Sequence, residues 1–368
     1  MIVKIGNIFE SQATTLVNTI NCVGIMGKGI AQEFKKRYPD MFKEYATMCK
    51  NGEIKPGIPY LYQNLFGISI LNFPTKDHWR SPSKLSYIVS GLDWFRNHYK
   101  ELGITSIAFP PLGCGNGGLA WSVVGPLMYS KLNDLPINVE IYAPYGTAPE
   151  QLTTKYLTEK SQNSYGEIIG VQREKLDKNW LLILYVIKKL NNDKYSLNVG
   201  RTIFQKICFL LTRTGVKTGF NFVKSQYGPY SVEAKQAVIA LSNANLITEK
   251  RLGNMVETIV SPEFNLDYMS YSFDDIQNAE KTYDLLSRIN STDQAEMIAT
   301  VLFSYDKLIE KNKTATEKQI YEYVIDWKPH WIVKKYEVET TIRSLSTLNW
   351  MKPDSTQDNL DLSDDWMY

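Results

Sequence analysis

The strongest sign of the fold is at residues 110–118, which read Pro110-Pro111-Leu112-Gly113-Cys114-Gly115-Asn116-Gly117-Gly118. This run follows Ile104–Phe109, an apolar stretch typical of a buried β-strand, and precedes the helical pattern of Trp121 to Leu132. A loop with four glycines in six residues can aim several backbone N–H groups at one point, which suits a phosphate group. One such loop could also be purely structural.

Another loop of this kind is Val23-Gly24-Ile25-Met26-Gly27-Lys28-Gly29-Ile30, shortly after the strand-like Thr15–Asn21. In chain order, residues 23–30 are the first glycine-rich loop and residues 110–118 are the second. Its glycines allow close backbone approach to a ligand, and the helix that follows offers free N–H groups to an anion. Its spacing fits neither GxGxxG nor a P-loop. Two glycine-rich loops at the carboxyl ends of two strands favour one crevice and a diphosphate-containing ligand.

The first 146 residues alternate between the two periodicities. Strands are expected at Ile2–Ile5, Ile68–Phe73, which Pro74 should stop, and Ile137–Ala143. Helices are expected at Ile30 to Tyr38 and Lys84–Tyr99, and the helix of Trp121 to Leu132 should start or kink at Pro126. Strands that alternate with helices predict a layered α/β sheet.

The second half has a different pattern. Residues 147–176 are polar and are interpreted as a linker between a domain at 1–150 and a domain at 175–368. Expected helices are Trp180–Leu190, Ile203–Leu211, Val232–Leu246, Asp293–Ile309 and Glu317–Ile325. Leu246–Arg251 and Val256–Val260, joined through Gly253-Asn254, predict a hairpin behind a helix, as in a winged helix.

A faint echo at an offset of 104 pairs Val238, Leu241, Asn245 and Ile247 with Ile342, Leu345, Asn349 and Met351. It indicates either two winged-helix-like halves or a chance similarity between two helix ends.

Composition narrows the class of protein. The net charge is only +2, so no global field points to nucleic acid. The four cysteines are scattered, which indicates a reducing, cytoplasmic setting without a cysteine zinc site. The N-terminus is interpreted as a strand rather than a signal peptide, and no apolar run has the roughly 18 residues of a membrane span. We therefore expect no metal, no cofactor and no membrane partner.

A third motif, Asn72-Phe73-Pro74-Thr75-Lys76-Asp77-His78-Trp79-Arg80, also follows a strand. Its lysine, histidine, tryptophan and arginine are candidates for a reactive rim. An exposed basic loop explains the same residues equally well.

Together these motifs resemble the macrodomain family over residues 1 to about 146. The resemblance rests on Gly6-Asn7-Ile8, on Val17-Asn18-Thr19-Ile20-Asn21 and on both glycine-rich loops, in order and spacing. The third motif narrows it to the DarG type, macrodomain antitoxins that remove ADP-ribose from DNA bases modified by a DarT toxin. The expected architecture is an α/β macrodomain, with a mixed sheet between helices, followed by a mostly α-helical, winged-helix-like second domain.

The resemblance implies roles for matching residues. Lys76 matches the lysine that this family uses for hydrolysis, and Asn21 would lie near the distal ribose and assist catalysis. Asn7 stands where many macrodomains have an aspartate that receives the adenine amino group, and its amide oxygen can still accept that bond. The full set expected to bind ADP-ribose is Asn7, Ile8, Asn21, Gly24, Ile25, Met26, Gly27, Lys28, Gly29, Ile30, Thr75, Leu112, Gly113, Cys114, Gly115, Asn116, Gly117, Gly118 and Leu119.

The second half carries a shorter resemblance. Residues 204–211, Phe204-Gln205-Lys206-Ile207-Cys208-Phe209-Leu210-Leu211, followed by Tyr227-Gly228-Pro229-Tyr230-Ser231, look like the SocA-like, or Panacea, antitoxin domain. Such domains neutralise toxins by binding them, which implies a cognate DarT toxin as a partner.

The leading hypothesis is an ADP-ribosyl glycohydrolase that acts on ADP-ribosylated DNA and belongs to an antitoxin. The motifs hold no pair of carboxylates, so a lysine must supply the chemistry. The alternatives are a module that binds ADP-ribose without cleaving it, a macrodomain hydrolase acting on ADP-ribose phosphate or ADP-ribosylated protein, and a protein-binding antitoxin with a vestigial macrodomain. A catalytic lysine favours the first over the second, and intact glycine loops disfavour the last.

Overall fold

A computed structural model of the chain describes residues 1–63, 67–161, 173, 176–252 and 255–354. The chain divides into two units, with the main boundary between Lys175 and Leu176. None of the helices in these residues combines the length and apolarity that a membrane span needs.

The N-terminal unit is a layered α/β structure. Its strands are β1 (Ile2–Ile5), β2 (Thr15–Asn21), β3 (Tyr60–Tyr62), β4 (Ser69–Lys76), β5 (Ser106–Phe109) and β6 (Asn138–Ala143). Its helices are η1 (Ile8–Glu10), α1 (Gly29–Arg37), α2 (Pro39–Lys50), α3 (Leu85–His98), α4 (Trp121–Leu132), η2 (Pro149–Leu152) and α5 (Thr154–Ser161). The strand order is β1-β6-β5-β2-β4-β3, and only β3 runs antiparallel to its neighbour. The predicted mixed sheet between helices is confirmed.

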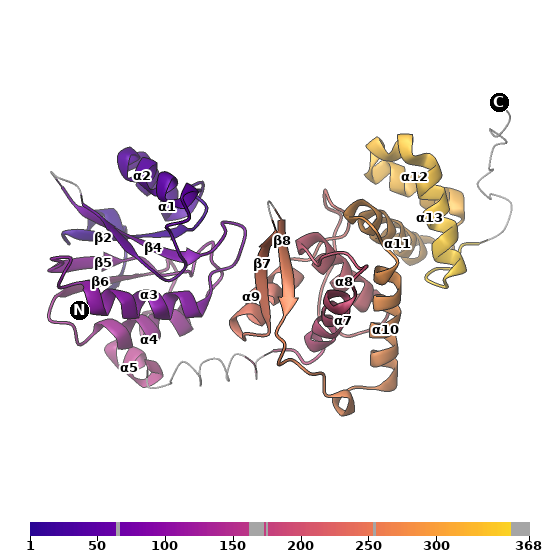
Figure 1. The fold of residues 1–368 in the computed structure, drawn as a ribbon. Helices are drawn as coiled ribbons and strands as arrows, with labels where there is room; N and C mark the ends of the chain where they lie inside the picture. Colours follow the sequence, from indigo (N-terminus) through magenta and orange to yellow (C-terminus); the bar gives the residue numbers. More distant parts are fainter. Residues whose placement is uncertain (64–66, 162–172, 174–175, 253–254, 355–368) are drawn as a thin grey trace. The chain divides into compact units, whose positions relative to one another are not determined.

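Alternation along β2 explains the two layers of helices. Leu16 and Ile20 belong to the core cluster that contains Phe34 of α1 and Tyr45 of α2, whereas Val17 belongs to the cluster of α3 and α4. Successive side chains of a strand point to opposite faces, so a central strand must be apolar on both. Figure 1 shows α1 and α2 on one side of the sheet and α3 and α4 on the other.

The observed bounds of two elements that contain proline differ from the predicted ones. Strand β4 does not stop at Pro74 but continues to Lys76. Since β3 pairs with β4 only as far as Asn72, Pro74 lies where β4 has no strand on that side, and its missing N–H leaves no ladder bond unmade. Helix α4 begins at Trp121 and passes through Pro126, so a helix start at Pro126 is wrong.

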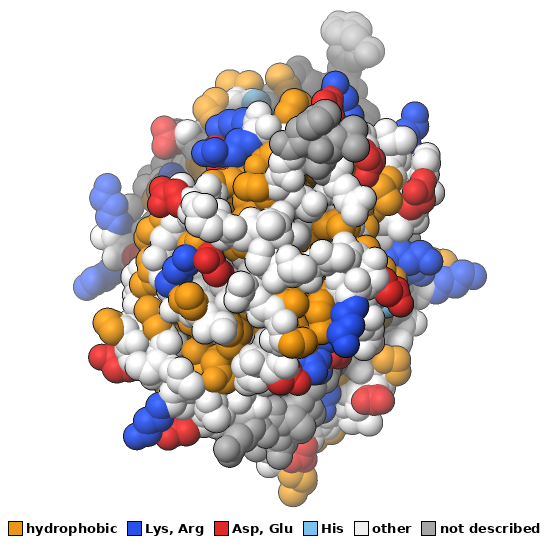
Figure 2. All heavy atoms as spheres, turned by 90° about the vertical axis from the view of Figure 1, so that its left-hand side faces the viewer, with side chains coloured by type: hydrophobic (Ala, Val, Ile, Leu, Met, Phe, Trp, Pro, Cys, Tyr) orange, Lys and Arg blue, Asp and Glu red, His pale blue; other side chains and the backbone are white. Residues whose placement is uncertain are grey.

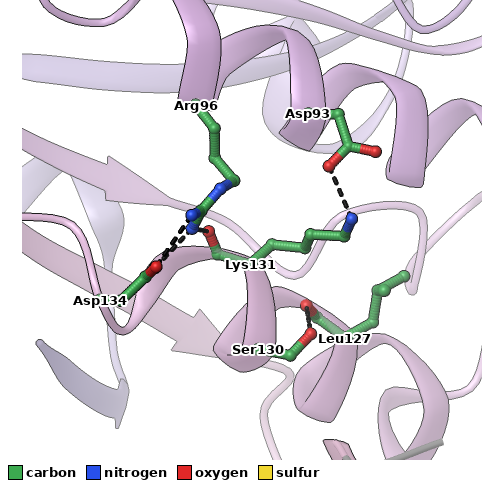
Figure 3. A network of polar contacts seen from close by, with 6 residues as sticks. All are labelled: Asp93, Arg96, Leu127, Ser130, Lys131 and Asp134. Carbon is green, nitrogen blue, oxygen red and sulfur yellow. Dashed lines mark hydrogen bonds and ion pairs between the residues drawn. The ribbon is translucent and has the colours of Figure 1, made fainter. Parts of the chain in front are cut away.

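Ion pairs join α3 to α4 on the outer face of the unit. Lys131 Nζ lies 2.6 Å from Asp93 Oδ1, and Arg96 Nη2 lies 2.8 Å from Asp134 Oδ2 (Figure 3). Each exposed pair contributes only about 0–1 kcal/mol, but together they fix α4, which follows the second glycine-rich loop. On the face that Figure 2 shows, basic and acidic side chains are interspersed, without a field of one sign.

The polar stretch after β6 is not all linker. Residues 149–161 form η2 and α5, and Leu157 of α5 is buried. α5 packs on α4, because this leucine gives an otherwise polar helix one apolar anchor. Of the rest of the predicted linker, the structure describes Thr147, Ala148, Arg173 and Leu176, and the other residues lie outside the described part of the chain.

The second unit is mostly helical. Its elements are α7 (Trp180–Asn192), α8 (Arg201–Arg213), α9 (Val232–Asn243), β7 (Ile247–Leu252), β8 (Met255–Val260), η3 (Tyr268–Ser270), α10 (Phe273–Ser287), α11 (Thr292–Asn312), α12 (Glu317–Trp327), η4 (Pro329–Lys334) and α13 (Lys335–Thr347). The five predicted helices and the hairpin β7–β8 are confirmed, while the hairpin's turn at 253–254 lies outside the described residues. Helices α8 and α11 contribute long buried runs to its core.

The internal echo marks two helix ends. Asn245 and Asn349 have φ values of 56° and 55°, in the left-handed region that asparagine tolerates after a helix. The described residues after α13 contain no second hairpin. The shared asparagine therefore reflects a shared way of ending a helix.

Candidate functional site

Parallel pairing of β2 with β4 brings the two expected catalytic residues together. Asn21 and Lys76 are the last residues of these strands and are register partners, after a shift between Ile20 and Asn21. The pairing continues one step further, because Cys22 N donates to Asp77 O over 3.0 Å. Residues 55 positions apart in the sequence thus leave the sheet side by side.

Lys76 joins the third motif to the second glycine-rich loop. Its Nζ donates to the carbonyl oxygen of Asn116 over 2.6 Å. The first loop reaches the same place, because a Cβ at Gly29 would lie 3.0 Å from Asn116 Nδ2. The structure therefore unites all three motifs of the sequence at one edge of the sheet.

Asn21 shapes the first loop from within. Its side-chain oxygen accepts from Val23 N over 3.0 Å, and its Nδ2 donates to Ile25 O. Tyr45 Oη lies 3.1 Å from the same side-chain oxygen. With 7% of its surface exposed, Asn21 is an internal scaffold of the loop, a role that its assignment to the ribose had not predicted.

Backbone N–H groups of both loops are available to an anion. Within the described chain, the N–H groups of Gly115, Asn116 and Gly117 donate to no acceptor, whereas those of Gly118 and Leu119 are used inside the loop. Helix α1 begins at Gly29 without a side-chain cap, so its first N–H groups are also open. Two such donor sets that meet at Asn116 can bind two phosphates.

Residues 77–83, here called the strap, connect the two loops. Asp77 O accepts from Cys22 N of the first loop, and Ser83 N donates to Gly117 O of the second over 3.0 Å. Ser83 is fully buried against Gly113 and Gly117. Ser83 was not among the expected site residues, because a lone serine before a helix carries no chemical signature.

The other end of the edge holds Asn7 and Ile8. Asn7 caps η1, with its Oδ1 accepting from Phe9 N over 3.1 Å, and Ile8 is buried. Tyr145, two residues after the end of β6, which pairs with β1, is 77% exposed and was not among the expected site residues. An aromatic residue just after the last strand was the signal that could have found it.

The remaining expected residues divide by exposure. Met26, Thr75, Leu112 and Leu119 are buried, so they can offer a ligand only their backbone, whereas Ile25, Gly27, Lys28 and Gly29 are exposed, and Gly24, Ile30 and Cys114 are intermediate. Burial raises the pKa of Cys22 and of Cys114 to about 12, so both are protonated thiols at neutral pH. The two thiols are therefore poor nucleophiles, and Lys76 is the expected catalytic residue that contacts a glycine-rich loop.

In the second unit, residues 204–211 and residues 227–231 contact each other. Gln205 of α8 exchanges two hydrogen bonds with the backbone of Ser231, at 3.0 and 2.9 Å. Lys206, 2% exposed, donates to Tyr227 O and, over 3.1 Å, to Pro229 O. Residues 227–231 are thus held by α8, and Tyr227 stands exposed on this segment.

Known proteins match this chain in the same region. Residues 17–128 match the Macro domain family. A Mycobacterium tuberculosis protein named DNA ADP-ribosyl glycohydrolase is 34% identical over 250 residues, 65% of this chain and 66% of its own length. The solved macrodomain of Mycobacterium tuberculosis DarG is 46% identical, with 39% of this chain and 98% of that one covered and a TM-score of 0.37. Thermosipho africanus DarTG in complex with ADP-ribose is 42% identical over 41% of this chain and 44% of that one, with a TM-score of 0.40.

Residues 17–128 of the N-terminal unit therefore form a Macro domain. Its homologues include the DarG proteins. The match spans just under two thirds of the mycobacterial enzyme's length.

Proposed function

We propose that this chain is a DarG-type antitoxin whose macrodomain removes ADP-ribose from modified DNA bases and whose second unit binds the cognate DarT toxin. The observation that carries the proposal is the contact of Lys76 with the second glycine-rich loop, beside Asn21 and the first. A module that only binds ADP-ribose has no need for an amine at this place. The names of the homologous glycohydrolases support the same activity.

ADP-ribose would lie along the carboxyl edge of the sheet. The open N–H groups of residues 115–117 and of the start of α1 would receive the diphosphate. Asn7 and the exposed Tyr145 lie at the ends of β1 and β6, where they would contact adenine. The distal ribose would then reach Lys76 at the other end. Asn21 would act through the loop that it holds.

Hydrolysis must break the bond between the anomeric carbon and the base. Lys76 has two ways to assist. Its neutral amine can attack the anomeric carbon while the bonding electrons leave with the base, which takes up the proton that the amine loses. Water then hydrolyses the lysine adduct, which releases ADP-ribose and restores the amine. Alternatively, its ammonium can donate that proton to the departing base while water attacks. Reductive trapping with borohydride would capture only a covalent lysine adduct and so separates the two.

Release of free ADP-ribose from ADP-ribosylated single-stranded DNA tests the activity. The Lys76→Ala variant should bind ADP-ribose as the wild type does, because the diphosphate contacts are elsewhere. Its turnover should fall by about 10²–10⁴-fold, the usual contribution of acid–base assistance. ADP-ribosylated protein serves as the competing substrate. A wild-type protein that binds ADP-ribose but releases none from either substrate would be a binding module.

We infer for the second unit a SocA-like, toxin-binding role. Its support is that α8 holds residues 227–231 from beneath, so that Tyr227 is presented on a fixed backbone. An antitoxin that acts on bacterial DNA would work in the cytoplasm.

A further inference from the structure

The middle of the strap consists of Trp79 and Arg80, here called the tip. These two residues have no role in the reaction proposed for Lys76. Trp79 is 44% exposed and Arg80 is exposed as well, although Ser81, Pro82 and Ser83 directly behind them are buried. The Trp79 indole therefore offers an aromatic surface that a ligand can reach. The tip begins three residues after Lys76, so it borders the proposed reaction site.

Backbone hydrogen bonds hold the strap at both ends. Asp77 O accepts from Cys22 N, and Ser83 N donates to Gly117 O. Within it, Ser81 N donates to His78 O over 2.9 Å, and Arg80 N donates to His78 Nδ1 over 3.2 Å. Trp79 therefore stands on a scaffold that is fixed to both sides of the pocket.

The tip combines a positive charge with an aromatic ring. The Arg80 guanidinium lies 4.6 Å from the centroid of the Trp79 ring, and across the described residues it has no carboxylate partner. An exposed indole that has an unpaired guanidinium over its ring suits a base with its phosphate.

We propose that Trp79 and Arg80 form a platform for the single-stranded DNA next to the modified base, with Trp79 stacked on a neighbouring base and Arg80 on a backbone phosphate. This rests on the proposed function. A base whose ADP-ribose is in the pocket cannot stay within a duplex, so its neighbour loses a stacking partner. Trp79 replaces that partner. A peptide substrate would offer neither a base nor a phosphate.

Turnover of two substrates by the full chain tests the platform. One is a single strand of about 12 nucleotides that carries one ADP-ribosylated base, and the other is the ADP-ribosylated nucleoside alone. Trp79→Ala should lower kcat/KM on the strand about 5- to 100-fold, mainly through KM, as expected from loss of one stacked base. It should leave turnover of the nucleoside unchanged, and Trp79→Phe should recover most of the loss.

A matched control exists in the second unit, where Tyr195 is 82% exposed with Lys194 Nζ 5.9 Å from its ring centroid. Tyr195→Ala should behave as the wild type does. Arg80→Ala should flatten the salt dependence of strand binding by about 0.7 in log–log slope, the value for one phosphate of a single strand. Equal losses by Trp79→Ala on strand and nucleoside would instead place Trp79 in the ADP-ribose pocket and overturn the platform.

Direct binding separates this proposal from the proposed function. Fluorescence anisotropy with an unmodified single strand at low salt needs no hydrolysis. If the wild type hydrolyses nothing but Trp79→Ala weakens strand binding relative to Tyr195→Ala, the platform stands and the activity fails. If hydrolysis of the strand is normal in Trp79→Ala and strand binding is unchanged, the activity stands and the platform is wrong.

Discussion

At the scale of single residues, Gly117 has no room for a side chain. A Cβ there would lie 2.2 Å from Gly113 O and 2.3 Å from Ser83 Oγ, whereas a Cβ at Gly115 would meet nothing within 4 Å. Gly117→Ala should therefore move the loop, lower stability by about 1–3 kcal/mol and weaken ADP-ribose binding at least about tenfold. Gly115→Ala, the matched control, should keep the melting temperature. Calorimetric titration and thermal unfolding measure both, and wild-type affinity in Gly117→Ala would remove this loop from the pocket.

Asn21 gives a second prediction at this scale. Asn21→Ala removes the acceptor for Val23 N and the donor to Ile25 O in a buried place. Unmade buried bonds cost about 1–3 kcal/mol, so the melting temperature and the ADP-ribose affinity should fall together. A direct catalytic role would instead lower turnover at unchanged stability and affinity. Titration, melting and turnover measurements on the same variant separate these outcomes.

At the scale of elements, Lys206 makes the attachment of residues 227–231 to α8 sensitive to pH. Burial lowers its pKa to about 8, against the pull of Glu296 and with the repulsion of Lys328. A neutral amine still has two hydrogens, which match its two acceptors, Tyr227 O and Pro229 O. Between pH 8 and the ordinary lysine pKa of 10.5 the unfolded chain binds more protons than the folded one. The stability that Lys206 contributes therefore rises with pH in this range.

Lys206→Met should abolish this rise. The free energy of unfolding of the wild type, relative to the variant, should increase by up to about 2 kcal/mol from pH 8 to pH 9.5. Urea denaturation of both proteins at both pH values measures it. A difference that does not change with pH would mean that Lys206 stays charged throughout.

Elements also mark the limit of prediction from sequence. Strand β2 was predicted at its observed bounds, because a β-branched, apolar run that ends in Asn21 has one reading. The end of β4 was not, because whether Pro74 breaks a strand depends on where β3 stops, which is tertiary information. The site was likewise predictable from sequence only in part. The glycine loops and Lys76 are visible as motifs, but Ser83 and the internal bonds of Asn21 arise only when the loops pack together.

At the scale of the whole molecule, two functions occupy two units with separate machinery. Gly117→Glu in the full chain places a carboxylate among the open N–H groups and should abolish ADP-ribose binding while toxin binding persists. Tyr227→Ala should weaken toxin binding and leave ADP-ribose affinity unchanged. Titration with ADP-ribose and a pull-down with the DarT toxin, applied to both variants, measure this. Loss of both activities in either variant would contradict the division of labour.

The anchored strap also has a consequence for the kinetics of recognition. A rim tied to both glycine-rich loops is already in place before a ligand arrives, so little chain entropy is lost on binding. The association rate constant should then be similar for ligands that fit the pocket well and for ligands that fit it poorly. Selectivity among ligands should be expressed in residence time, that is, in how slowly the right one departs.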